Sequence, residues 1–120
     1  MAQETGIVNE NLEAVLTIKL ANNSTIECAI DTGFNGWLLL PRTFIEENLM
    51  PFIGLEKVTM FEGNDIFVET ALAKVDWLGK EFSVKTLVSE TDETLIGTQM
   101  LVGSVLEIDY ENLIVTVTKK

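Results

Sequence analysis

The most informative segment of the sequence is an alternating apolar run that leads into an acidic turn: Ile26-Glu27-Cys28-Ala29-Ile30-Asp31-Thr32-Gly33. Ile26, Cys28 and Ile30 alternate with Glu27 and Ala29, which is typical of a half-buried β-strand. Leu16 to Leu20 alternates in the same way, and the turn-forming Asn22-Asn23-Ser24 lies between the two segments. We therefore predict a β-hairpin whose second strand ends at Asp31.

The rest of the chain has the same strand-like character. Trp37 to Leu40 predicts a short apolar strand that stops at Pro41, and one short helix follows, with Phe44, Ile45 and Leu49 on its apolar face. Further strands are predicted at Val58 to Phe61, Ile66 to Trp77, Glu81 to Val88, Leu95 to Gly97, Val105 to Ile108 and Leu113 to Val117, with one helical turn at Thr98 to Leu101. The predicted fold class is all-β, a small barrel or sandwich with one short helix, in a single domain over residues 1–120.

Composition excludes several kinds of chemistry. The chain has no histidine, which removes Ser-His-Asp and Cys-His catalysis and the usual zinc ligand sets. Its one cysteine, Cys28, cannot form an intrachain disulfide and has no basic neighbour, so it is interpreted as a buried apolar residue. Any hydrolytic chemistry in this chain must therefore use carboxylates.

Charge and hydropathy restrict the partners and the compartment. The net charge of −11 argues against nucleic acid as a partner, because phosphate binding depends on Lys and Arg. No apolar run is long enough to cross a membrane, and the N-terminal residues lack the pattern of a secretory signal. The expectation from sequence is a cytoplasmic protein with no membrane partner.

The triplet Asp31-Thr32-Gly33 is common by itself, and its setting makes it informative. A second apolar-apolar-Gly element, Leu95-Ile96-Gly97, lies downstream, and a predicted hairpin with Gly63 at its tip lies between the two. This order resembles the retropepsin-like aspartic peptidases, over roughly Leu16 to Tyr110. The most similar are the small prokaryotic single-domain members, whose loop reads Asp-Thr-Gly-Phe, as Asp31 to Phe34 does here.

The resemblance implies a half-barrel protomer of a homodimer that hydrolyses peptide bonds in a peptide or protein substrate, without a metal or an organic cofactor. Asp31 would be the catalytic carboxylate, paired with its twin from the second subunit, and the two would share one proton because both cannot ionise easily. Thr32 would hydrogen-bond across to the partner's loop. Gly33 would let the two loops approach closely. Leu95-Ile96-Gly97 would support the loop from behind.

Three further residues are implied to bind substrate. Gly63 and Asn64 would form the tip of a mobile flap, and Phe34 would shape the pocket beside the carboxylates. Phe34 is also a departure from the family, since better-known members have a small residue or serine there. Terminal segments, especially Leu113 to Val117, are expected to pair between subunits, because an apolar strand left unpaired would be an exposed edge.

Two other interpretations remain open. The chain could keep the fold without the chemistry, as a dimerisation or peptide-binding module that clamps extended segments. Alternatively, it could be a structural β-barrel protein in which Asp31-Thr32-Gly33 is an ordinary turn. Trp37 and Trp77 are predicted to pack in the core or at an interface, and Asp109 to form a turn.

Overall fold

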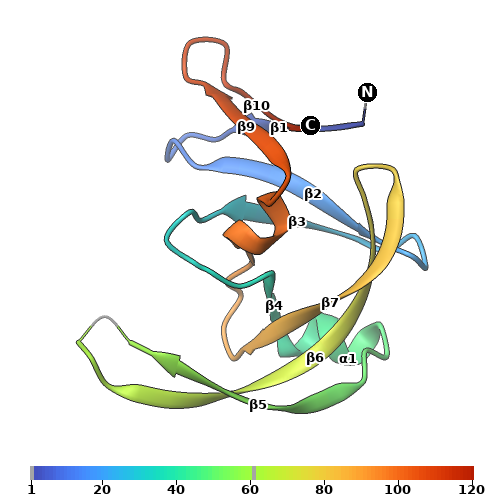
Figure 1. The fold of residues 1–120 in the computed structure, drawn as a ribbon, viewed down its shortest axis with the longest axis vertical. Coiled ribbons are helices and arrows are strands. Elements are labelled where there is room, and N and C mark those ends of the chain that lie inside the picture. Colours follow the sequence, from blue (N-terminus) through green and yellow to red (C-terminus); the bar gives the residue numbers. More distant parts are fainter. Residues whose placement is uncertain (1, 61) are drawn as a thin grey trace.

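The computed structural model describes residues 2–60 and 62–120, and its main feature is one strongly curved sheet (Figure 1). The strands are β1 (Gln3–Val8), β2 (Ala14–Leu20), β3 (Thr25–Ile30), β4 (Leu38–Pro41), β5 (Phe52–Thr59), β6 (Asp65–Trp77), β7 (Lys80–Ser89), β8 (Leu95–Ile96), β9 (Ser104–Asp109) and β10 (Ile114–Lys119). Their order in the sheet is β5-β6-β7-β4-β8-β3-β2-β1-β10-β9, and a further pairing of β6 with β2 folds the sheet back on itself. The predicted all-β half-barrel with one short helix, α1 (Arg42–Glu47), is confirmed.

The predicted hairpin at the start of the chain is confirmed as β2 and β3, which pair from Val15↔Ala29 to Lys19↔Thr25. Leu16, Ile18 and Cys28 point into the core and are almost fully buried. The same core takes Trp77, whose indole Nε1 donates a hydrogen bond to the carbonyl oxygen of Met100 at 3.1 Å. The predicted helical turn at Thr98–Leu101 is present as a 3-10 turn, η1.

The prediction for the helix was wrong in two details. Pro41 was expected in the first turn of the helix, but it is the last residue of β4 and the N-cap of α1. Ile45 is the residue that α1 buries, whereas Leu49 is 87% exposed because its positive φ of 55° turns the side chain away from the body. Met50 takes the buried place that the apolar pattern had given to Leu49.

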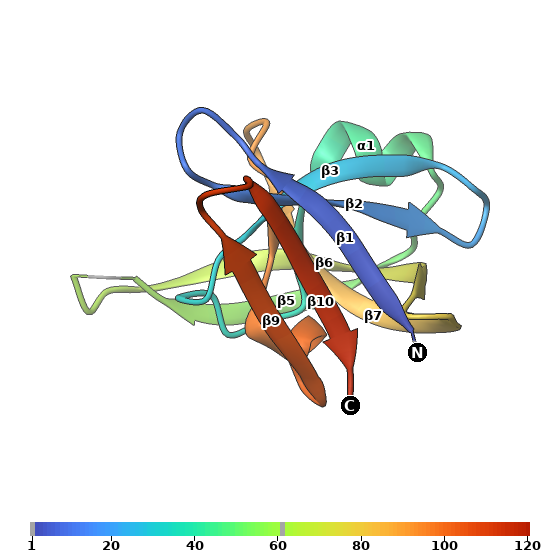
Figure 2. The ribbon, with the colours of Figure 1, turned by 90° about the horizontal axis from the view of Figure 1, so that it is seen from above.

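The strand expected from Val58 to Phe61 starts earlier and is longer than predicted, because β5 begins at Phe52. Phe61 itself lies outside the described residues. The sequence did not show this strand because β5 is at the edge of the sheet and most of its residues are exposed, so apolar and polar positions do not alternate. Together β5 and β6 form a long hairpin that projects from the body in both views (Figure 2).

The expectation that Leu113 to Val117 pairs between subunits was also wrong, because the segment is already paired on both sides within the chain. This segment lies largely in β10, which pairs with β9 on one side and with β1 on the other. β1 was not predicted because Gln3–Val8 has only two large apolar residues and buries only Val8. Among the described strands, β9 pairs only with β10, so the free edge at this end of the sheet belongs to β9.

Candidate active site

The Asp31 turn lies at the end of β3, near the middle of the sheet, where β3, β8 and β4 are neighbouring strands. The short strand β8 lies between β3 and β4, parallel to β3 and antiparallel to β4. Where β3 ends, the Asp31 N–H donates to the carbonyl oxygen of Ile96 at 2.9 Å, which continues the ladder by one residue. The loop then leaves the sheet, and it returns as β4 from Leu38. The carboxylate is thus fixed at the end of a paired strand, on rigid backbone.

Local hydrogen bonds set the shape of the turn. The Gly33 N–H donates to the Asp31 Oδ1 at 2.9 Å, and the Phe34 N–H donates to the Asp31 carbonyl oxygen at 3.1 Å. The first of these bonds orients the carboxylate. Asp31 is half-buried, whereas Thr32 and Gly33 are exposed on the outside of the loop. A Cβ on Gly33 would lie 3.2 Å from the Asp31 Oδ1, so glycine suits this position for steric reasons as well.

Phe34 packs behind the turn, where the chain has two glycines. A Cβ on Gly36 would lie 2.6 Å from the ring of Phe34, and a Cβ on Gly97 would lie 2.8 Å from it. The carbonyl oxygen of Phe34 accepts hydrogen bonds from the Thr98 N–H at 2.9 Å and from its hydroxyl at 3.4 Å. The aromatic ring therefore fills space that side chains at Gly36 and Gly97 would otherwise occupy. Phe34 supports the loop in addition to the pocket-lining role expected of it.

A groove runs between this loop and strand β5. One cavity of about 440 Å³ is lined by the backbone stretch Gly33–Gly36, by residues 56–59 of β5 and by Leu87. A neighbouring cavity of about 330 Å³ shares Asn35, Gly36, Glu56 and Leu87 with the first, so the two form one continuous depression. The groove thus begins next to Asp31 and passes under the β5–β6 hairpin.

An ion pair crosses this groove. The Lys85 Nζ on β7 donates to the Glu56 Oε1 on β5 at 3.2 Å, and both residues line the smaller cavity. Glu56, Lys85 and Gln99 line the smaller cavity although they are far apart in the sequence, so no local pattern could have identified them. The hairpin side of the groove is mostly polar, with one apolar side chain, since it is lined by Glu56, Lys57, Val58 and Thr59.

The tip of the hairpin holds Gly63 and Asn64, as predicted. The Met60 N–H donates to the Asn64 carbonyl oxygen at 2.6 Å, and the Gly63 N–H donates to the Met60 carbonyl oxygen at 2.8 Å. Gly63 has a φ of 88°, which favours glycine in this turn. Neither residue lines the groove within this chain. The structure therefore brings Asp31, Thr32, Gly33 and Phe34 together and leaves Gly63 and Asn64 at a distance, on the projecting end of the hairpin (Figure 1).

Cys28 is buried next to this site on β3, and its burial raises the pKa of the thiol to about 12. We expect Cys28 to resist a thiol reagent at pH 8 in the folded protein and to react fully in denaturant. Only about one thiol in 10⁴ is ionised four pH units below its pKa, and the thiolate is the reactive form. Because the folded pKa is raised, this group's contribution to stability is complete below about pH 9 and is lost as the pH rises toward 12. Rapid labelling of the native protein at pH 8 would contradict this assignment.

Within residues 2–60 and 62–120, no group of three or more carboxylate or cysteine side chains is placed to hold a metal ion. Over the same residues, no helix has the length and apolar character needed to span a membrane.

This chain is similar to the solved structures of several retropepsin-like proteases. A retropepsin-like aspartic protease from Rickettsia conorii aligns over 98% of this chain and 90% of its own, with a TM-score of 0.70 and 19% identity. The Simian Foamy Virus (mac) protease aligns over 72% of this chain and 90% of its own, with a TM-score of 0.53 and 16% identity. The EIAV protease, solved with the inhibitor HBY-793, aligns over 78% of this chain and 88% of its own, with a TM-score of 0.56 and 17% identity. The sequence matches no family model and no curated protein.

The fold is therefore that of the retropepsin-like aspartic proteases, as the resemblance in sequence implied. At these identities the similarity establishes the architecture, and the chemistry of the site has to be argued from its residues.

Proposed function

We propose that this chain is one protomer of an aspartic endopeptidase, whose site forms when the Asp31 loops of two identical subunits meet. The observation that carries the proposal is the position of the Asp31 carboxylate. It lies at the end of β3, oriented by the Gly33 N–H, beside a groove that starts at Gly33 and whose larger cavity has a volume of about 440 Å³. The exposed Thr32 and Gly33 lie on the outside of the same loop, where a partner's loop can approach.

The proposed chemistry uses one shared proton. The ionised Asp31 carboxylate takes a proton from a water molecule, whose oxygen attacks the carbonyl carbon of the peptide bond. The protonated Asp31 of the other subunit donates a hydrogen bond to the carbonyl oxygen and stabilises the charge that develops there. The Asp31 carboxyl that took the proton from water then gives it to the leaving amine nitrogen as the C–N bond breaks, and the pair is left with one shared proton as before. One chain supplies one such carboxylate, so the mechanism requires a symmetric dimer.

The groove suits an extended peptide. Among the described strands, β5 pairs only with β6, so its other edge is open for backbone hydrogen bonds along the substrate. Val58 lines the groove, and its side chain suits an apolar side chain of the substrate.

Activity is expected to depend on assembly. Below the dissociation constant of the dimer, the cleavage rate should rise with the square of the protein concentration, because two chains make one site. Each chain carries a net charge of −11, so the assay should be run near 0.15 M salt, where the Debye length is about 8 Å. Sedimentation equilibrium at the same concentrations gives the fraction of dimer. A specific activity that stays constant while the dimer dissociates would contradict the proposal.

A further inference from the structure

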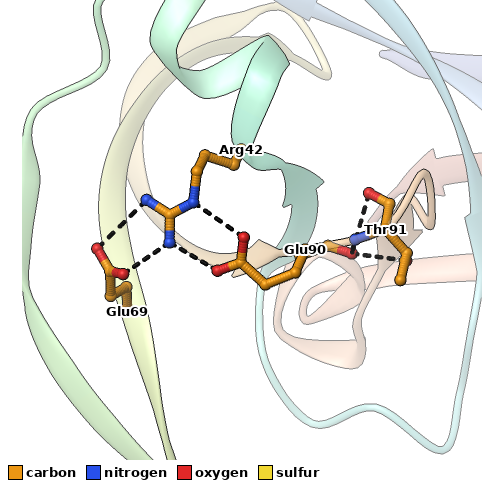
Figure 3. A network of polar contacts seen from close by, with 5 residues as sticks. Arg42, Glu69, Glu90 and Thr91 are labelled. Atoms are coloured by element: carbon orange, nitrogen blue, oxygen red, sulfur yellow. Dashed lines mark hydrogen bonds and ion pairs between the residues drawn. The ribbon is translucent and has the colours of Figure 1, made fainter.

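Arg42 connects three separate parts of the fold. Its Nη2 lies 2.6 Å from the Glu69 Oε1 on β6 and 2.6 Å from the Glu90 Oε2 in the loop after β7, and its Nε donates to the Glu90 Oε1 at 2.9 Å. Its guanidinium carbon lies 5.6 Å from the ring centroid of Phe52 on β5. Figure 3 shows the guanidinium between the two carboxylates. One side chain thus contacts both strands of the β5–β6 hairpin and a loop of the body.

These contacts lie where the hairpin leaves the body. The pairing of β6 with β7 ends at Thr70↔Leu87, and beyond that pair Asp65 to Glu69 is paired with β5 alone. On β5 the register shifts between Phe52 and Gly54, and Gly54 has a φ of 139°. A bulge of this kind bends a strand. The hairpin therefore leaves the body at a bulge on β5 and at the end of the β7 ladder on β6, and Arg42 contacts Phe52 and Glu69 at these two points.

The other end of the network is fixed to the body. Pro41 pairs with Ser89 at the end of the β4–β7 ladder, so Arg42 and Glu90 each follow a paired residue directly. The Ser89 hydroxyl accepts a hydrogen bond from the Thr91 N–H at 3.1 Å and lies 3.0 Å from the Thr91 hydroxyl, which holds the turn around Glu90. Arg42 keeps the pKa of Glu90 below its usual value, so this carboxylate stays charged in mildly acidic solution.

We infer that these two points, where the hairpin leaves the body, are the hinge of the flap, which is the β5–β6 hairpin, and that Arg42 is the clamp of this hinge. Its contacts with Phe52 and Glu69 hold the hairpin in position over the groove. Arg42 is a positioning residue, because it lines neither cavity of the groove and acts through Phe52 and Glu69. The hinge itself does not depend on the proposed function, whereas its effect on catalysis does. Since Glu69 and Glu90 are well exposed, the network should add little to global stability. Removal of the network should therefore increase local opening of the hairpin and have little effect on global unfolding.

Residue-resolved hydrogen exchange of the free protein tests the clamp. In Arg42→Met, amides of residues 55–59 and 65–69 should exchange about fivefold faster, the upper end expected for an exposed ion pair. Amides of β2 and β3 should be unchanged. Lys74→Met is the matched control, because it removes the exposed Lys74–Glu81 ion pair at the other end of β6. Exchange in the hairpin that is unchanged, or accelerated equally throughout the chain, would overturn the inference.

Arg42→Lys tests whether the guanidinium group is needed or whether a positive charge at this position is enough. Lysine keeps the charge but cannot donate from a planar fork to two carboxylates at once, so Arg42→Lys should restore only part of the protection. Should Arg42→Met not fold, Glu69→Gln and Glu90→Gln each remove one arm of the network, and each should accelerate the same amides. Full protection in both of these variants would equally overturn the clamp.

Peptide kinetics then separate this inference from the proposed function. A looser flap should raise KM about fivefold, the factor expected for hydrogen exchange. It should change kcat less, because Arg42 is remote from the Asp31 loop. If neither the wild type nor any variant cleaves peptide, the proposed function fails. The hydrogen-exchange result still shows whether Arg42 restrains the hairpin. If the wild type cleaves but exchange and KM do not respond to Arg42→Met, the function stands and the clamp fails.

Discussion

Asp31→Asn is expected to lower kcat/KM for peptide cleavage by roughly 10³–10⁴-fold, which is the upper range for loss of a general acid or base. Asparagine has the shape of aspartate but cannot take a proton from water. Its side-chain oxygen can still accept the Gly33 N–H bond, which now measures 2.9 Å, so the turn and the fold should survive. Circular dichroism and a urea titration check the fold, and a mixed peptide library at mildly acidic pH measures cleavage.

Asp76→Asn is the control for this experiment. It removes one negative charge from an exposed residue of β6 whose ion pair with Lys19 spans 3.7 Å, so the change in charge is the same and the site is untouched. Its activity should equal that of the wild type. Equal turnover by Asp31→Asn would assign the cleavage to another protein or another site. A wild type that binds peptide and never cleaves it would favour the silent binding module.

Gly97→Ala should lower the free energy of unfolding by about 3 kcal/mol and abolish activity, because there is no room for a Cβ where Gly97 packs against Gly36 behind the Asp31 loop. A Cβ at this buried position would overlap the carbonyl oxygen of Gly36 and lie 2.7 Å from its carbonyl carbon. The backbone cannot move away freely, because the Gly97 N–H donates to the Trp37 carbonyl oxygen at 2.9 Å. Urea denaturation measures the loss, and a change below about 0.5 kcal/mol, the level of a neutral surface substitution, would contradict the packing described here.

Gly36→Ala adds a methyl group on the other side of the Gly36–Gly97 contact, and its effect can be compared with that of Gly97→Ala. Its Cβ would meet only the ring of Phe34, at 2.6 Å from Cζ. A smaller side chain relieves that clash, so Phe34→Leu should recover part of the stability of Gly36→Ala, with a coupling of about 1 kcal/mol. Phe34→Leu should not recover Gly97→Ala, because the Gly36 carbonyl group remains in place. The two double mutants therefore distinguish a side-chain clash from a backbone clash.

The part of the fold that could be predicted is the part encoded by local patterns. Strands β2 and β3 alternate strictly because one face of each is buried, and the Asp31 turn follows from Asp and Gly next to such a strand. β1 and the first half of β5 could not be found in this way. The first is mostly polar, and the second is exposed on both faces at the edge of the sheet.

The site was predictable to the same degree. Asp31 to Phe34 are adjacent in sequence, so one motif identifies them. Glu56 and Lys85 belong to the groove only because β5, β6 and β7 pair in one register, and no local signal reports such a register. Arg42 and its two carboxylates are likewise separated along the chain, and their meeting depends on where the β6–β7 ladder ends.

If one active site needs an Asp31 from each of two chains, mixing wild-type subunits with Asp31→Asn subunits should inhibit cleavage. A fixed amount of wild-type protein is equilibrated with increasing amounts of Asp31→Asn, and peptide cleavage is followed. If the site is shared, wild-type chains are drawn into heterodimers with a single carboxylate, and activity should fall toward zero as the variant reaches large excess. Asp76→Asn added in the same amounts should raise activity. Cleavage that stays constant however much Asp31→Asn is added would contradict the shared site.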